Sequence, residues 1–147
     1  MPGTPEETFR RLLDLLLAKD MDAVADLWAE DGTAAFPFAV GAAPRQLAGR
    51  EAIRAYLADY PQRMDVRAVP AVTVHRTERP DTIVVEFTAD GLTVRTGAPY
   101  RLDYIAVITV RGGLVTHYRD YWSPLATASA AGRLPELLDS LRSEATR

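Results

Sequence analysis

One carboxylic acid between two large aromatic residues is the feature of this sequence best suited to chemistry. Asp120 follows Tyr118 and precedes Trp122. A Gly-Gly pair before this segment suits a tight hairpin turn and Pro124 ends it, so residues 114–122 are predicted to form the last strand of a sheet. Because side chains alternate along a strand, one face should carry Leu114, Thr116, Tyr118, Asp120 and Trp122.

The chemistry open to Asp120 depends on where that face points. If the face lines a closed hollow, desolvation disfavours the carboxylate and raises its pKa toward neutrality, where the group can accept and return a proton. If the face meets water, Asp120 and its neighbour Arg119 are ordinary surface charges. Asp120 is the leading candidate for a general acid or base.

Three further residues are candidates for catalysis. Tyr104 and Tyr118 could each donate a hydrogen bond to a developing oxyanion. The simpler explanation of both is core packing with the hydroxyl bonded to a neighbour, and it suits Tyr118 better than Tyr104. His75 is a candidate second base, but a lone histidine on a strand is more often structural or solvated. Strand alternation places Glu86 and Asp103 on the opposite, outward face.

Large apolar and aromatic residues could form the wall of a substrate pocket, although each by itself is better explained as core. This predicted wall consists of Trp28, Phe36, Phe38, Tyr56, Tyr60, Met64, Phe87 and Trp122.

Composition excludes several classes of function. With 147 residues, 48% of them hydrophobic, the chain is expected to form a single domain over residues 1–147. A net charge of −3 argues against a nucleic-acid or anionic-membrane partner, and the lack of cysteine excludes thiol chemistry. No phosphate-binding glycine loop, nucleophile elbow or metal-ligand spacing occurs, so we expect neither a metal nor a cofactor. Without a signal or membrane-spanning segment, a soluble cytoplasmic protein is expected.

The first half of the chain has the periodicity of helices. Thr4-Pro5-Glu6-Glu7 is a capping-box sequence that predicts a helix from residue 4 to near residue 19. Asp22 is predicted to cap a second short helix that ends before Gly32, and a third helix is predicted over residues 49–60. The stretch 33–40 between them is broken by proline, which predicts an edge strand or extended arm.

From Met64 onward the pattern becomes extended. Strands are predicted over residues 66–77, 82–94 and 99–110, followed by the strand that carries Asp120, with a short helix at residues 134–141. Sequential long strands joined by short turns indicate an antiparallel sheet, and helices segregated from it indicate an α+β domain. So few long strands must curl around the helices to bury one face, which predicts a hollow cone.

Several motifs match a known family. They are Asp20-Met21-Asp22 through Asp31-Gly32, Gly49 to Arg54, Gly113-Leu114-Val115, and Tyr118 to Leu125. In these the chain resembles the nuclear-transport-factor-2-like superfamily, in particular its SnoaL-like and ketosteroid-isomerase-like branch, over nearly its whole length. The resemblance implies helices packed in a strongly curved antiparallel sheet that encloses an apolar pocket. It also implies a homodimer formed through the outer face of the sheet.

The resemblance carries over only part of the family's catalytic residues. The proton-shuttling aspartate of ketosteroid isomerases falls on Phe36, their oxyanion tyrosine near Leu12, and their second oxyanion acid near Ala106 or, in a shifted register, Asp103. Steroid isomerisation by that set of residues is therefore not expected. Asp120 matches the water-activating aspartate of limonene-epoxide-type hydrolases, whose Arg-x-Asp partner falls near Phe87 and Ala89.

We therefore expect a cofactor-independent cyclase or isomerase of bacterial secondary metabolism. Its substrate would be an apolar, polyketide-like or carbonyl-bearing small molecule, and Asp120 would be the acid/base. An epoxide hydrolase and a non-catalytic small-molecule-binding module remain the alternatives.

Overall fold

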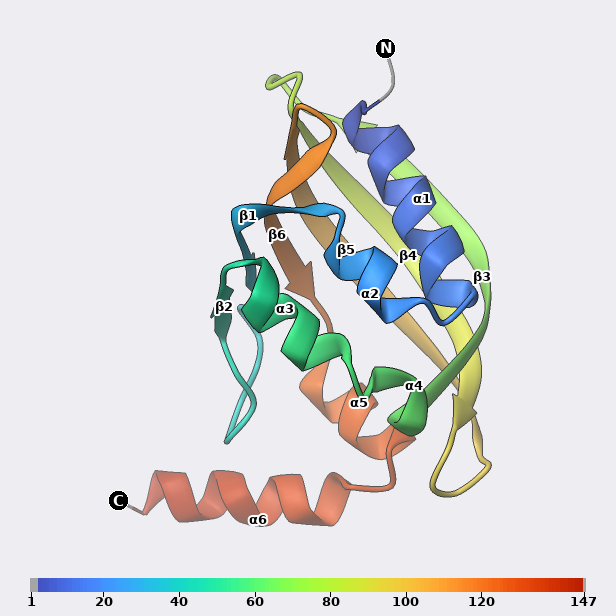
Figure 1. The fold of residues 1–147 in the computed structure, drawn as a ribbon. Coiled ribbons are helices and arrows are strands. Elements are labelled where there is room, and N and C mark those ends of the chain that lie inside the picture. Colours follow the sequence, from blue (N-terminus) through green and yellow to red (C-terminus); the bar gives the residue numbers. More distant parts are fainter. Residues whose placement is uncertain (1–2, 147) are drawn as a thin grey trace.

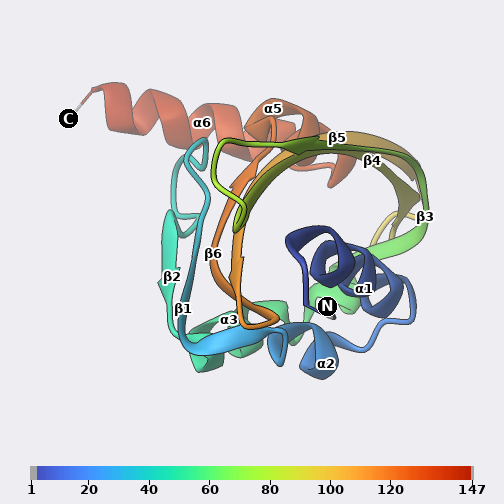
Figure 2. The same cartoon turned by 90° about the horizontal axis from the view of Figure 1, so that it is seen from above.

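A strongly curved six-stranded sheet wraps around the N-terminal helices in the computed structural model, which describes residues 3–146 (Figures 1 and 2). The strands follow the order β2-β1-β6-β5-β4-β3 across the sheet. Their bounds are β1 Trp28–Ala35, β2 Gln46–Ala48, β3 Met64–Arg76, β4 Thr82–Thr93, β5 Pro99–Arg111 and β6 Leu114–Tyr121. The helices are α1 Pro5–Leu17, α2 Met21–Ala25, α3 Arg50–Leu57, α4 Tyr60–Arg63, α5 Pro124–Ala130 and α6 Leu134–Ala145.

The core lies between α1 and the concave face of the sheet. Phe9 is 1% exposed, and with Leu12 and Leu13 it packs against alternate residues of β4 and β5, such as Val85 and Ile108. Each such side chain contributes roughly 1.5–3 kcal/mol when it is fully buried. Alternate side chains of the long strands are thus buried against the helix, and the sheet curves over it. This is the α+β cone that the sequence predicted.

The first helix begins as predicted. Thr4 is its N-cap, and the hydroxyl Oγ1 of Thr4 accepts a hydrogen bond from the backbone N–H of Glu7 at 3.2 Å. The second helix differs from its prediction, because Asp20 rather than Asp22 caps it, accepting from the N–H of Ala23 at 3.1 Å. It ends at Ala25, so Trp28 starts a strand instead of continuing the helical face. The predicted third helix is divided into α3 and α4, with Pro61 inside the first turn of α4.

The strand β1 is internal, whereas the sequence predicted an edge strand or arm. It pairs with β2 on one side and runs parallel to β6 on the other, which makes it the exception in an otherwise antiparallel sheet. The short strand β2 takes the edge. Proline-containing residues 36–45, which suggested an edge, form the loop that joins the two strands.

The last hairpin turns at Gly112 and Gly113, whose φ angles of 59° and 78° are open to glycine at little cost. A bulge follows, because Thr109 pairs with His117 while Val110 pairs with Val115. Thr116 is the extra residue. Val115 is therefore buried and Leu114 exposed, the reverse of strict alternation, and the predicted face is regained at Tyr118.

The helix α5 closes one end of the cone. β5 extends beyond the end of β6, since residues 99–104 pair with β4 alone, and α5 packs against β5. The hydroxyl of Thr93 on β4 donates to the carbonyl of Ala130 at 2.7 Å, and Arg95 donates to that of Ala131 at 2.8 Å. Among residues 3–146, no helix pairs the length with the apolar character that a membrane crossing requires.

Gly91 on β4 is required by its neighbours and provides a test of the packing at that end. A methyl group at this position would meet the backbone carbonyl of Asp65 and lie 2.6 Å from the hydroxyl oxygen of Tyr100. We expect Gly91→Ala to lower the free energy of unfolding by about 1–3 kcal/mol, since a backbone carbonyl cannot rotate away. Urea denaturation measures this, and an unchanged midpoint would contradict the close approach.

Candidate functional site

The carboxyl group of Asp120 points to the concave side of the sheet. Asp120 pairs with Ala106 of β5, and Tyr118 pairs with Ile108. Ala106 and Ile108 belong to the buried face, being 0% and 1% exposed, and residues directly opposite in a ladder share a face. The bulge at Thr116 is what brings Asp120 onto this face together with Val115.

Within residues 3–146, no side chain or backbone group forms a hydrogen bond with the Oδ1 atom of this carboxyl. That atom is also shielded from solvent. Burial raises the pKa of Asp120 to about 7, and no lysine, arginine or histidine offsets that effect. Near neutral pH the group is therefore divided between its acid and its carboxylate form, which is the condition for exchanging protons with a ligand.

Four tyrosines from four different elements surround this carboxyl. They are Tyr56 of α3, Tyr60 of α4, Tyr104 of β5 and Tyr118 of β6, and burial raises the pKa of each phenol. The negative charge of Asp120 raises all four pKa values further, and no hydrogen bond contributes to any of them. The phenols stay protonated at neutral pH, so their hydroxyls remain hydrogen-bond donors in the neighbourhood of one acid.

Further aromatic side chains continue this group of four tyrosines into an aromatic wall. Trp28 lies 5.6 Å from Tyr118 between ring centroids. Phe36 is buried, with its ring 5.2 Å from that of Tyr56 and 6.4 Å from that of Trp122. Trp28 and Phe36 therefore lie next to the tyrosines that surround Asp120. Trp122 contacts Phe36 but lines a hollow on the outer side of the sheet.

Two other members of the predicted wall lie farther into the fold. Phe87 packs in the core, 5.3 Å from the ring of Phe9, and its other contact is a stack on Tyr104 at 5.0 Å. The Phe87 ring therefore supports one face of the Tyr104 ring. Met64 begins β3 and is half-buried.

His75 and Phe38 are on the outer face of the sheet, away from Asp120. The imidazole Nε2 of His75 lies 2.7 Å from Oε2 of Glu86, and both side chains are about half exposed. Phe38 is 56% exposed and meets Tyr121 edge-on at 5.1 Å. The sequence predicted His75 as a second base and Phe38 as part of the pocket wall, but both lie on the outer face of the sheet. Alternation along a strand shows which residues share a face, and it does not show which of the two faces is concave.

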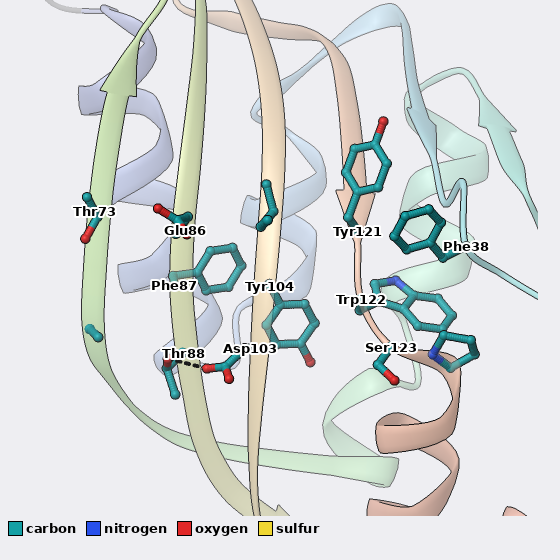
Figure 3. A pocket seen from close by; sticks show the side chains of 13 residues that line it. Phe38, Thr73, Glu86, Phe87, Thr88, Asp103, Tyr104, Tyr121, Trp122 and Ser123 are labelled. Atoms are coloured by element: carbon teal, nitrogen blue, oxygen red, sulfur yellow. Dashed lines mark hydrogen bonds between the residues drawn. The ribbon is translucent and has the colours of Figure 1, made fainter.

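The outer face has a hollow of its own, of about 700 Å³ (Figure 3). Outward side chains of β3, β4 and β5 line it together with Phe38, Tyr121 and the start of α5. Within it, the hydroxyl of Thr88 donates to Asp103 at 2.6 Å. Glu86 and Asp103 thus face outward as predicted, and the hollow is separated from Asp120 by the thickness of the sheet.

Two features that the sequence patterns did not indicate are the inward-facing Tyr100 of β5 and the helix α5. Tyr100 is 8% exposed, lies on the same face of β5 as Leu102 and Tyr104, and its buried hydroxyl has no partner. Its spacing of four residues from Tyr104 could have indicated a shared face. For α5, the Ser123-Pro124 sequence is an N-cap followed by proline at the first helical position, a signal that was read only as the end of a strand.

Comparison with known proteins identifies the family. The family model described as a SnoaL-like domain matches residues 9–118, which span most of the described fold and include Tyr118. The chain belongs to the SnoaL-like domain family. This SnoaL-like domain is 40% identical over 126 residues to the uncharacterized protein YesE of Bacillus subtilis, with 86% of each chain covered. It is 34% identical over 120 residues to an uncharacterized PhzA/B-like protein of Pseudomonas aeruginosa, covering 82% of this chain and 84% of that one.

Solved structures agree with the fold. A structure named "Putative Isomerase from Bacillus subtilis" is 39% identical and superposes with a TM-score of 0.85, covering 88% of this chain and 93% of that one. A "putative polyketide cyclase" from Xanthomonas campestris is 18% identical with a TM-score of 0.73, covering 86% and 96%. At that identity the second likeness establishes the shared fold alone. The predicted superfamily and α+β cone are confirmed.

The raised pKa of Asp120 predicts an unusual dependence of stability on pH. Between about pH 4 and pH 7 the folded protein holds a proton on Asp120 that the unfolded chain has released, so stability falls as pH rises and levels off above pH 7. Its size is on the order of 4 kcal/mol. In Asp120→Asn this component is absent, so urea denaturation should show the variant gaining stability relative to the parent across that window.

Subtracting the pH dependence of the parent's free energy of unfolding from that of Asp120→Asn removes the contributions of Asp65, Asp81 and Asp90, which both proteins share. Their pKa values are lowered by hydrogen bonds, to Lys19, Thr82 and Arg101 respectively, and they therefore act below pH 4. A difference between variant and parent that stays constant from pH 4.5 to pH 8 would show that Asp120 is hydrated.

Proposed function

We propose that this protein is a cofactor-independent cyclase or isomerase that acts on an apolar, carbonyl-bearing small molecule, with Asp120 as the acid/base. The observation that carries the proposal is a buried carboxyl without a protein partner, poised near neutral pH and surrounded by phenol donors. Two of the structural neighbours carry the names "Putative Isomerase" and "putative polyketide cyclase", which agree with this reaction class. Secondary metabolism is the setting we expect from that chemistry.

The proposed reaction begins at a carbon next to the substrate carbonyl. The carboxylate form of Asp120 removes a proton from that carbon, and the electron pair moves to the carbonyl oxygen to give an enolate. A phenol hydroxyl, from Tyr104 or Tyr118, donates a hydrogen bond to the enolate oxygen and stabilises it. No external oxidant or reductant is needed, since the proton is returned at the end.

The second half of the reaction distinguishes the two outcomes. In an isomerisation, Asp120 returns the proton to a different carbon of the same π system. In a cyclisation, the enolate carbon attacks a second carbonyl of the folded substrate, a carbon–carbon bond forms, and the new alkoxide takes the proton from Asp120. The aromatic wall contributes by holding the substrate in the folded conformation.

The two alternatives differ from this proposal in observable ways. An epoxide hydrolase would place oxygen from water in a diol product, whereas the proposed reaction incorporates none. A binding module would hold its ligand without turnover. The cluster of Asp120 with protonated phenols favours proton transfer at a carbonyl over both, because no second carboxyl group among residues 3–146 acts on Asp120 that could protonate an epoxide.

Exchange of protons on a simple ketone tests the proposed chemistry without knowledge of the natural substrate. In D₂O, the protein should accelerate the exchange of the α-protons of 2-tetralone, followed by proton NMR. Asp120→Asn should lower that acceleration by about 10²–10⁴-fold, the usual contribution of a general base. Asp103→Asn, which alters an acid on the outer face of β5, serves as the matched control and should exchange at the parental rate.

Two results would count against the proposal. One is full exchange activity in Asp120→Asn, and the other is the absence of any acceleration above the rate of buffer. Far-ultraviolet circular dichroism of both variants ensures that a loss reflects chemistry rather than unfolding.

We also propose that the protein forms a homodimer through the outer face of the sheet. Ile105 is 44% exposed at the centre of that face and borders the hollow with Phe38 and Tyr121. An apolar side chain so exposed in the middle of a sheet suits burial by a second copy. Association there would leave the concave face free for the ligand.

Light scattering at micromolar concentration should give the mass of a dimer. Ile105→Glu should shift the mass toward the monomer, because it buries a charge in the interface. Leu114→Glu, at an equally apolar exposed position near the last hairpin, is the control and should remain dimeric. A monomer mass for the parent protein would refute this mode of association.

A further inference from the structure

The loop that joins β1 to β2 begins with Phe36, which lies beside Asp120. In the parallel pairing of β1 with β6, the last residues in register are Ala35 and Arg119. Phe36 and Asp120 come directly after these two, and both lie on the inward face, since Phe36 is 7% exposed and the Oδ1 atom of Asp120 is shielded from solvent. The ring of Phe36 lies 5.2 Å from that of Tyr56. Phe36 therefore forms the wall of the site on the side of Asp120 that faces β1.

A tight turn determines the direction of the Phe36 ring. Residues 36–39 form a β-turn in which the carbonyl of Phe36 accepts a hydrogen bond from the N–H of Ala39 at 3.0 Å. Pro37 at the second position suits such a turn, because its ring fixes the φ angle. The turn places Phe36 inside the fold and leaves Phe38 outside, 56% exposed. The position of the inner ring therefore depends on how firmly the turn is held.

Arg45, near the other end of the loop, holds the turn through three hydrogen bonds. Its backbone carbonyl accepts from the N–H of Phe36 at 2.9 Å. Its guanidinium donates from Nη1 to the carbonyl of Ala39 at 2.8 Å and from Nη2 to the carbonyl of Pro37 at 3.0 Å. A planar guanidinium can bridge two acceptors in this way, whereas the ammonium of a lysine is a single point charge.

The charge of Arg45 does not itself act on Asp120. Burial alone accounts for the raised pKa of Asp120, and no cation lowers it. The titratable groups around the acid are phenols from α3, α4, β5 and β6, namely Tyr56, Tyr60, Tyr104 and Tyr118. An effect of Arg45 on the acid must therefore pass through the turn and the ring of Phe36.

We infer that Arg45 is a positioning residue of the concave site: its guanidinium fixes the turn at residues 36–39 and so holds the ring of Phe36 beside the carboxyl of Asp120. With the ring in place, water is kept from that side of the acid. If the turn loosens, the ring can leave the wall and water can reach the carboxyl. The use of this arrangement in turnover rests on the proposed function, whereas the hydrogen bonds that fix the turn do not.

A change that keeps the charge but removes the bridge tests this role. Arg45→Lys remains positive yet cannot bond both carbonyls at once. Carbon-13 NMR titration of the Asp120 carboxyl, assigned by its absence in Asp120→Asn, should show the pKa falling from about 7 to about 6, because water stabilises the carboxylate. Arg45→Gln should give a similar fall. Loss of a nearby cation would instead raise the pKa, so the direction of the change separates the bridge from the charge.

A second variant shows whether the effect passes through the ring. Phe36→Leu should lower the pKa of Asp120 by a similar amount, and adding Arg45→Lys to it should change little, because residues that act through one another are not additive. Arg111→Lys is the matched control, since it makes the same exchange at an exposed ion pair with Asp81 and should leave the pKa at its parental value. Circular dichroism verifies that each variant is folded.

Proton exchange on 2-tetralone provides a readout of the same change under the proposed function. Above pH 8, where Asp120 is deprotonated in every variant, Arg45→Lys should exchange about three- to tenfold more slowly, because a weaker base removes a proton more slowly. If the parent protein shows no exchange, the proposed function fails, and the NMR titration still decides the role of Arg45.

Three results would overturn the inference. One is an unchanged pKa of Asp120 in a folded Arg45→Lys. Another is a pKa that rises in Arg45→Gln, which would assign the effect to the charge of the guanidinium. The third is an equal effect of Arg45→Lys with and without the ring of Phe36, which would mean that Arg45 acts by a different route.

Discussion

A buried carboxyl without a counter-charge is the constraint around which the concave side of this protein is arranged. Placing an acid in an apolar enclosure costs free energy unless it is protonated, paired or solvated. Here Asp120 has no cation nearby and one oxygen with no partner, so protonation is the remaining response and its pKa rises to about 7. Natural sequences retain such a destabilising group where the chemistry of the site requires it.

The curvature of the sheet is what makes that enclosure possible. Tyr56 and Tyr60 come from the consecutive helices α3 and α4, and Tyr104 and Tyr118 come from the consecutive strands β5 and β6. These two distant parts of the chain meet because β5 and β6 bend around the helices (Figure 2). The bulge at Thr116 then directs Asp120 inward. A flat sheet with strict alternation would spread these hydroxyls along a surface, where water would return the acid to its ordinary pKa.

Much of this arrangement could be predicted, because it depends on local signals. Capping at Thr4, the glycine pair of the last hairpin and period-2 runs in the long strands are local, and they gave the α+β cone correctly. Features set by distant contacts could not be predicted. The parallel partner of β1, the bulge at Thr116 and the concave side of each strand all depend on packing, and for that reason His75 and Phe38 were assigned to the site while the inward-facing Tyr100 was missed.

The direction from which hydroxyls reach the acid distinguishes this site from the one that the family resemblance implies. The position that matches the oxyanion tyrosine of ketosteroid isomerases is Leu12, which is 7% exposed in the core on the helix side. Here the phenols come from β5, β6, α3 and α4 instead. In the proposed reaction a substrate oxygen would therefore be held near the sheet rather than near α1, so the substrate would lie along β5.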